Sequence, residues 1–171
     1  MLGVAFPDDQ VQILAYNRVI SDLAGLTPRA FLDAVKAALP VAPGGAVPAR
    51  AGDVSMFVDN TWYTVTLAHD GGAPGDVIGR LDLSLLQNRL LAPILKVADQ
   101  RTDKRIDFVG GGRGIAALER LVGEGKAAVA FSLYPVQIGD VMAVSDAGDI
   151  MPPKSTWFEP KLRDGLLIHR I

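Results

Sequence analysis

The chain has 171 residues, of which 49% are hydrophobic, a formal net charge of −2 at pH 7 and no cysteine. The lack of cysteine excludes disulfides, a thiolate nucleophile and a thiolate metal site, and the near-neutral charge argues against a nucleic-acid partner, which usually needs a basic surface. No apolar run approaches the roughly 18 residues that span a bilayer, and the first residues lack the basic region of a secretory signal. We therefore expect one cytoplasmic domain over residues 1–171, with no membrane contact.

Hydrophobic periodicity and turn residues predict five elements in the first half of the chain. They are a strand at 11–20, a helix at 26–39, a loop at 40–52, a hairpin at 55–67 and a helix at 82–95. Thr27 is a suitable N-cap for the first helix, and Pro28 suits its first position because a missing N–H costs nothing there. Asp59–Asn60 suits the two-residue turn of the hairpin. Pro93 is expected to kink or end the second helix.

A strand, a glycine turn, a helix and a second strand occur in succession in the second half of the chain. They occupy residues 105–109, 110–114, 115–122 and 127–133. This order predicts a parallel pair of strands joined by a right-handed βαβ crossover. A further helix at 136–147 and a closing strand at 165–171 complete the set. The fold class is therefore α+β or α/β, with helices packed on a mixed sheet of about five or six strands.

The glycine turn is the first candidate binding site. Gly112-Arg-Gly-Ile-Ala-Ala117 has the loose pattern Gly-x-Gly-x-x-Ala between a strand and a helix. Backbone N–H groups from Gly111, Gly112 and Gly114 at a helix N-terminus can bind a phosphate or carboxylate, and Arg113 can add guanidinium donors. The next strand does not end in the acidic residue that a dinucleotide site needs, which argues against a nicotinamide cofactor. The alternative is an ordinary tight turn in which glycine allows positive φ.

The second candidate site is the segment MPPKSTWFEPKLRDG at 151–165. Lys154, Ser155 and Thr156 resemble the end of a phosphate-binding P-loop, but the two preceding prolines remove the flexible N–H donors that such a loop needs. Lys154 can still hold an anion as a point charge, and Ser155 or Thr156 can cap the next element of the chain. The alternative is a structural, extended segment held in the core by Trp157 and Phe158.

Two other groups of polar residues are weaker candidates. Asp103, Lys104, Arg105 and Asp107 lead into the glycine turn, where an aspartate could bind Mg²⁺ beside a phosphate, although such charged runs more often face water. His69 and His169 are far apart in sequence, and two histidines without cysteine do not predict a zinc site.

Four stretches of the chain together resemble the domain-of-unknown-function 1015 family of uncharacterised bacterial and archaeal proteins. They are FPDDQVQILAYNR at 6–18, DLSLLQ at 82–87, RTDKRIDFVG at 101–110 and MPPKSTWFEPKL at 151–162. The resemblance implies a C-terminal domain of a longer protein. Its other half would contain an Asp-Gly-His-His-Arg segment similar to that of ParB-like proteins and of kinases that phosphorylate free serine. It also implies that this chain alone is inactive if the parent protein is a small-molecule phosphotransferase using Mg²⁺ and a nucleotide.

Two functions from different classes remain open at this stage. In the first, the glycine turn and the Pro-Pro-Lys-Ser-Thr loop line one cleft that binds an anion or a phosphorylated small molecule, since ligands of α/β sheets bind beyond the carboxyl ends of the strands. In the second, the chain is a structural or interaction module that docks the N-terminal half of its parent protein or forms a homodimer.

Overall fold

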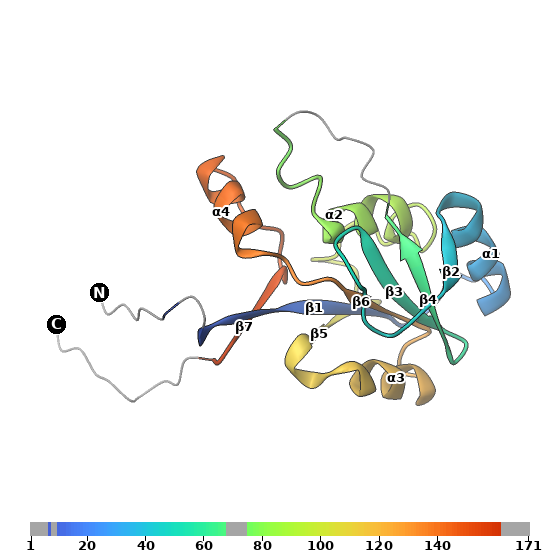
Figure 1. Cartoon of the computed structure of the whole chain (residues 1–171). Coiled ribbons are helices and arrows are strands. Elements are labelled where there is room, and N and C mark those ends of the chain that lie inside the picture. Colours follow the sequence, from blue (N-terminus) through green and yellow to red (C-terminus); the bar gives the residue numbers. More distant parts are fainter. Residues whose placement is uncertain (1–6, 8–9, 68–74, 162–171) are drawn as a thin grey trace.

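The computed structural model describes residues 7, 10–67 and 75–161, and the two histidines and the predicted closing strand at 165–171 lie outside them. The strands are β1 (Gln12–Ile20), β2 (Val41–Pro43), β3 (Asp53–Val58), β4 (Thr61–Thr66), β5 (Ile106–Gly110), β6 (Val129–Leu133) and β7 (Thr156–Glu159). The α-helices are α1 (Pro28–Ala38), α2 (Asp82–Leu86), α3 (Ile115–Gly123) and α4 (Ile138–Asp146). The seven strands form one sheet (Figure 1), so the predicted class of helices packed on a sheet is confirmed.

The strand order differs from a simple βαβ unit. Six strands have the order β2-β4-β3-β6-β1-β5, and β7 pairs with the first half of β1. Every pairing among the described strands is antiparallel. Strands β5 and β6, joined through α3, run in the same direction, but β1 lies between them and is antiparallel to both. The prediction of a directly paired parallel couple was therefore wrong, because the first strand of the chain takes the hydrogen-bonding edges that β5 and β6 would have shared.

Local sequence signals explain the start of α1 and the β3–β4 hairpin. The Thr27 hydroxyl accepts a hydrogen bond of 3.2 Å from the Ala30 N–H, and Pro28 occupies the first helical position, as predicted. Asp59 and Asn60 both have positive φ, 49° and 56°. Positive φ at both central residues is the geometry of the two-residue turns that match strand twist, so the predicted hairpin is confirmed.

The predicted helix at 82–95 is not continuous. Helix α2 ends at Leu86 and is followed by a π-helical segment at Gln87–Leu91 and by turns. The Gln87 side chain donates to the carbonyls of Val97 (2.8 Å) and Ala98 (3.2 Å), which fixes the returning loop close to the helix. Pro93, which has no N–H to donate, lies within these turns, as its chemistry requires.

The sheet separates two apolar cores of different size. Alternate residues of the strands point to opposite faces: Ile20 of β1 packs in the large core with α1 and α2, whereas Val19 packs in the small core with α3. Figure 1 shows α1 and α2 above the sheet and α3 below it. Helix α3 directs Ala117 and Leu118 into the small core. The large core carries most of the buried hydrophobic side chains and therefore most of the expected stability.

Helix α4 extends away from the sheet (Figure 1). Val144 is the buried residue of this helix. Two apolar residues of this helix, Ile138 and Met142, are each 59% exposed. Among the described residues, none of the helices combines the length and apolar character needed to cross a membrane.

Candidate functional site

The glycine turn lies between the end of β5 and the start of α3. Gly111–Arg113 form a single 3-10 turn closed by a 3.0 Å hydrogen bond from the Gly114 N–H to the Gly111 carbonyl. Gly114 is the N-cap of α3 and has φ 70°, which is why glycine suits the position. Glycine offers no side chain to cap the helix, so the first N–H groups of α3 keep their capacity to bind an acceptor.

Trp157 of β7 packs directly on this turn. A Cβ added at Gly110 would lie 2.3 Å from Cε3 of Trp157, and one added at Gly112 would lie 3.4 Å from its Nε1. The Trp157 Nε1–H is buried and has no hydrogen-bond acceptor among the described residues. The glycines have no side chains, so the indole can approach the backbone of the turn. The indole N–H lies beside the turn as a donor without an acceptor among the described residues.

The Pro-Pro-Lys-Ser-Thr segment forms a turn that leads into β7. The Ser155 hydroxyl donates to the Pro152 carbonyl, and Lys154 adopts φ 54° between them. Ser155 is 6% exposed. Its hydroxyl is therefore used to hold the turn, whereas the side chain of Lys154 is directed outward from it. The alternative of an extended segment agrees with strand β7, but Phe158 is 39% exposed and is therefore not held in the core as that alternative required.

Two lysines flank an aromatic pair beside the glycine turn. Tyr16 of β1 and Trp157 are in edge-to-face contact with ring centroids 5.3 Å apart. Lys154 Nζ lies 5.5 Å from the Tyr16 ring centroid, and Lys161 Nζ lies 4.2 Å from that of Trp157. Neither lysine forms an ion pair with any of the described residues. Both charges therefore remain available to an anion, held close to the turn by cation–π contacts.

The structure brings some of the candidate residues together and turns others away from the surface. Lys154 and the glycine turn are connected through Tyr16 and Trp157, so the two candidate segments approach each other. Ser155 faces inward and does not belong to a binding surface. The complete sets are Gly111, Gly112, Arg113 and Gly114 in the turn, and Lys154, Ser155 and Thr156 in the loop and the first residue of β7.

Sequence reasoning missed Arg18, which is the largest fully buried charged side chain of the described residues, with 1% exposure. Arg18 lies opposite Phe108 in β5 and two residues after Tyr16, so all three share one face of the sheet. The signal was present in the sequence: Arg18 is the only charge in the apolar strand at 11–20, at an alternating position that points to the core.

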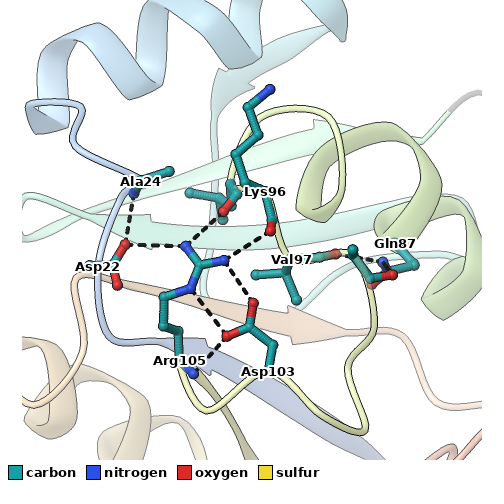
Figure 2. A network of polar contacts seen from close by, with 9 residues as sticks. Asp22, Ala24, Gln87, Lys96, Val97, Asp103 and Arg105 are labelled. Atoms are coloured by element: carbon teal, nitrogen blue, oxygen red, sulfur yellow. Dashed lines mark hydrogen bonds and ion pairs between the residues drawn. The ribbon is translucent and has the colours of Figure 1, made fainter.

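The charged run before the glycine turn is structural (Figure 2). Arg105 donates to both carboxylate oxygens of Asp103 and to the carbonyls of Leu95 (3.0 Å) and Lys96 (2.9 Å), and it contacts Asp22 at 3.4 Å. Hydrogen bonding to Arg105 lowers the pKa of the Asp103 carboxyl. The network fixes the 95–105 loop against the strands. Asp103 is not available to bind Mg²⁺, because both of its carboxylate oxygens accept hydrogen bonds from Arg105. The described residues contain no group of three acidic, cysteine or histidine side chains suited to a metal.

The family comparison matches the first half of the chain. The model for "Protein of unknown function (DUF1015)" matches residues 1–84. Residues 1–84 are therefore similar to the DUF1015 family. The resemblance stated from the sequence is thereby confirmed, and the matched part contains β1 with both Tyr16 and Arg18.

Solved structures share the fold of this chain. A "Conserved hypothetical protein from Pyrococcus furiosus" aligns with TM-score 0.51 and 17% identity, covering 88% of this chain and 57% of its own. A "Free serine kinase in complex with AMP" aligns with TM-score 0.51 and 13% identity, covering 88% and 55%. At such identities the likeness establishes the fold alone. A comparison with curated proteins gave no match.

The chain spans a little over half the length of these solved relatives, 57% and 55%. Its own contribution to any activity must therefore be argued from its own residues.

Proposed function

We propose that the protein binds a phosphorylated small molecule at the junction of the glycine turn and the Lys154 loop. The observation that carries the proposal is the packing of Trp157 against Gly110 and Gly112, because it joins two segments more than 40 positions apart in the sequence. Around this contact lie the free N–H groups of α3, the unpaired indole N–H, and the charges of Lys154 and Lys161. Arg113, which is exposed in the turn itself, adds guanidinium donors.

The chemistry of these groups suits a phosphate more than a neutral ligand. Helix N-terminal N–H groups and ammonium groups both favour a negative charge. The half-buried rings of Tyr16 and Trp157 offer apolar contact to the remainder of such a molecule. A nucleotide combines these two features, and the shared fold with a kinase whose structure contains AMP makes ADP and ATP, with Mg²⁺, the first ligands to test. A role in small-molecule phosphoryl transfer is the corresponding enzymatic form of the proposal.

Ligand-dependent melting tests the proposal. At about 100 times its dissociation constant a ligand stabilises the folded state by about 2.7 kcal/mol, which for a chain of this size corresponds to a rise in Tm of roughly 5–10 °C. Lys154→Ala should weaken binding about tenfold or more, because a charge-assisted contact contributes roughly 1.5–3 kcal/mol. Lys104→Ala, which removes the same charge from an exposed position away from the turn, is the matched control. Equal shifts in the two variants, or no shift with any phosphorylated ligand, would reject this site.

A second candidate function is self-association through an apolar face. Phe158 of β7 and Ile138 of α4 line a cavity of about 310 Å³ together with Val11, Ile13 and neighbouring residues. Met142, one turn along α4 from Ile138, is 59% exposed. Contiguous exposed apolar surface of this kind is typical of interfaces, and the same patch on two copies can pair across a twofold axis.

Light scattering over a range of concentrations tests this second candidate. The chain is expected to form dimers as concentration rises, and Met142→Glu should return it to a monomer by placing a charge in the interface. Ala37→Glu, an equivalent charge at an exposed position of α1 far from α4 (Figure 1), should leave the dimer largely intact. A monomer at all concentrations would exclude the homodimer.

A further inference from the structure

A buried arginine without an ionic partner lies beneath the proposed site. Arg18 is 1% exposed, and its Nη2 has no hydrogen-bond partner among the described residues. Its Nε donates to Gln100 Oε1 at 3.3 Å, its Nη1 donates to the Tyr16 carbonyl, and its guanidinium lies 5.2 Å from the Phe108 ring centroid. Burial lowers the pKa of Arg18 to about 10, so the side chain still carries its full charge at pH 7.

The carboxylate that lines the same cavity forms no ion pair with Arg18. Asp99 lines the same cavity as Arg18, but its Oδ1 accepts from Arg101 Nε and its Oδ2 accepts from Arg101 Nη2, both at 3.1 Å. Arg18 forms no ion pair with the described residues. A buried charge without an ionic partner lowers the stability of the folded state. The presence of Arg18 at this position therefore indicates a role other than stabilising the fold.

The arginine is held in a fixed orientation at the wall of a cavity of about 140 Å³. Gln100 accepts from Arg18 and donates to Gln87 Oε1 at 2.8 Å, and Gln87 in turn donates to the carbonyl of Val97. These hydrogen bonds fix the orientation of the guanidinium. The cavity is several times larger than the roughly 30 Å³ that one water occupies in the liquid, so it has room for a small polar group.

We propose that Arg18 anchors a second binding site, which takes the carboxylate or phosphate group of a small metabolite in the cavity between the Gln87–Arg101 region and Pro152–Pro153. The guanidinium has a planar set of donors that matches both groups. Because Nη2 is buried, the anion reaches it after a small displacement of the wall, and Pro152–Pro153 belongs to a segment without regular secondary structure. Neither the glycine turn nor Lys154 lines this cavity, so the inference does not rest on the proposed function.

The test compares the melting temperature of the full chain in sodium phosphate, sodium acetate and sodium chloride at equal ionic strength. Phosphate or acetate should raise Tm above the chloride value in the unaltered chain, and the anion whose rise depends more strongly on Arg18 identifies the group, because phosphate also stabilises folded proteins in general. The rise should be lost in Arg18→Met and retained in Arg29→Met, which removes the same charge from an exposed position in α1.

Each other result contradicts the proposal. Equal Tm in the three salts, or a full anion effect in Arg18→Met, overturns it. If the anion effect is lost in Lys154→Ala and kept in Arg18→Met, the anion binds only at the glycine turn. Should Arg18→Met fail to fold, NMR of the arginine side chains in the unaltered chain decides: the Arg18 Nε–Hε signal should shift and saturate with the anion, and an unmoved signal rejects the site.

Discussion

Replacing Phe131 by alanine is expected to lower the free energy of unfolding by about 3–5 kcal/mol, the range for a large aromatic side chain removed from a packed core. Phe131 is fully buried in β6 and lies opposite Met56 of β3 and Arg18 of β1, near the middle of the sheet. The loss includes both the removed apolar contacts and the cavity left behind. Equilibrium unfolding in urea, followed by tryptophan fluorescence, measures the change.

The matched control is Phe158→Ala in β7, the same substitution at a side chain that is 39% exposed. Its cost should be well below that of Phe131→Ala, because much of the ring is already in contact with water. Similar losses for the two variants would contradict the assignment of β6 to the centre of the large core.

Replacing Gly110 by alanine is expected to disrupt the contact between the glycine turn and β7. The new Cβ would lie 2.3 Å from Cε3 and 2.4 Å from Cζ3 of Trp157, far inside van der Waals contact. A rigid ring cannot yield as the end of a flexible chain can, so Trp157 or the β7 backbone must move. The expected cost is about 1–3 kcal/mol or more, with a changed near-ultraviolet circular dichroism signal from Trp157.

Two comparisons separate this clash from a general effect of adding a methyl group. Gly139→Ala in α4 meets no atom within 4 Å and should stabilise by about 0.5–1 kcal/mol, because glycine is a poor helix former. In a chain already carrying Trp157→Ala, the cost of Gly110→Ala should largely disappear, as expected for two residues in direct contact. Full additivity of the two changes would contradict the packing described here.

Local signals were sufficient for most of the elements. The Thr27–Pro28 pair determined the start of α1, and Asp59–Asn60 determined the hairpin, because capping and turn chemistry act within a few residues. The strand order could not be deduced in the same way. Whether β5 and β6 touch or admit β1 between them depends on pairings over about a hundred residues, for which hydrophobic periodicity gives no information.

The candidate site was predicted in part. The two segments were expected to approach each other, and the contact between them is made by Trp157 and the glycines rather than by Lys154 directly. The sequence predicts Ser155 as a ligand-binding residue, whereas its hydroxyl donates to the Pro152 carbonyl within the turn. Arg18 is the only charge of its apolar strand, which the sequence shows, but its lack of an ion pair with the described residues is visible only in the structure, where the Asp99–Arg101 region lies beside it.

The pairing of β7 with Gln12–Ala15 ties the last described strand to the first. During synthesis the backbone of β1 leaves the ribosome long before that of β7, so the N–H and C=O groups of its first half must wait for their partners. Until then they form an open edge that can recruit the strand of another molecule. The sheet is therefore complete only after β7 has been translated, and until then the first half of β1 is open to pairing with strands of other molecules.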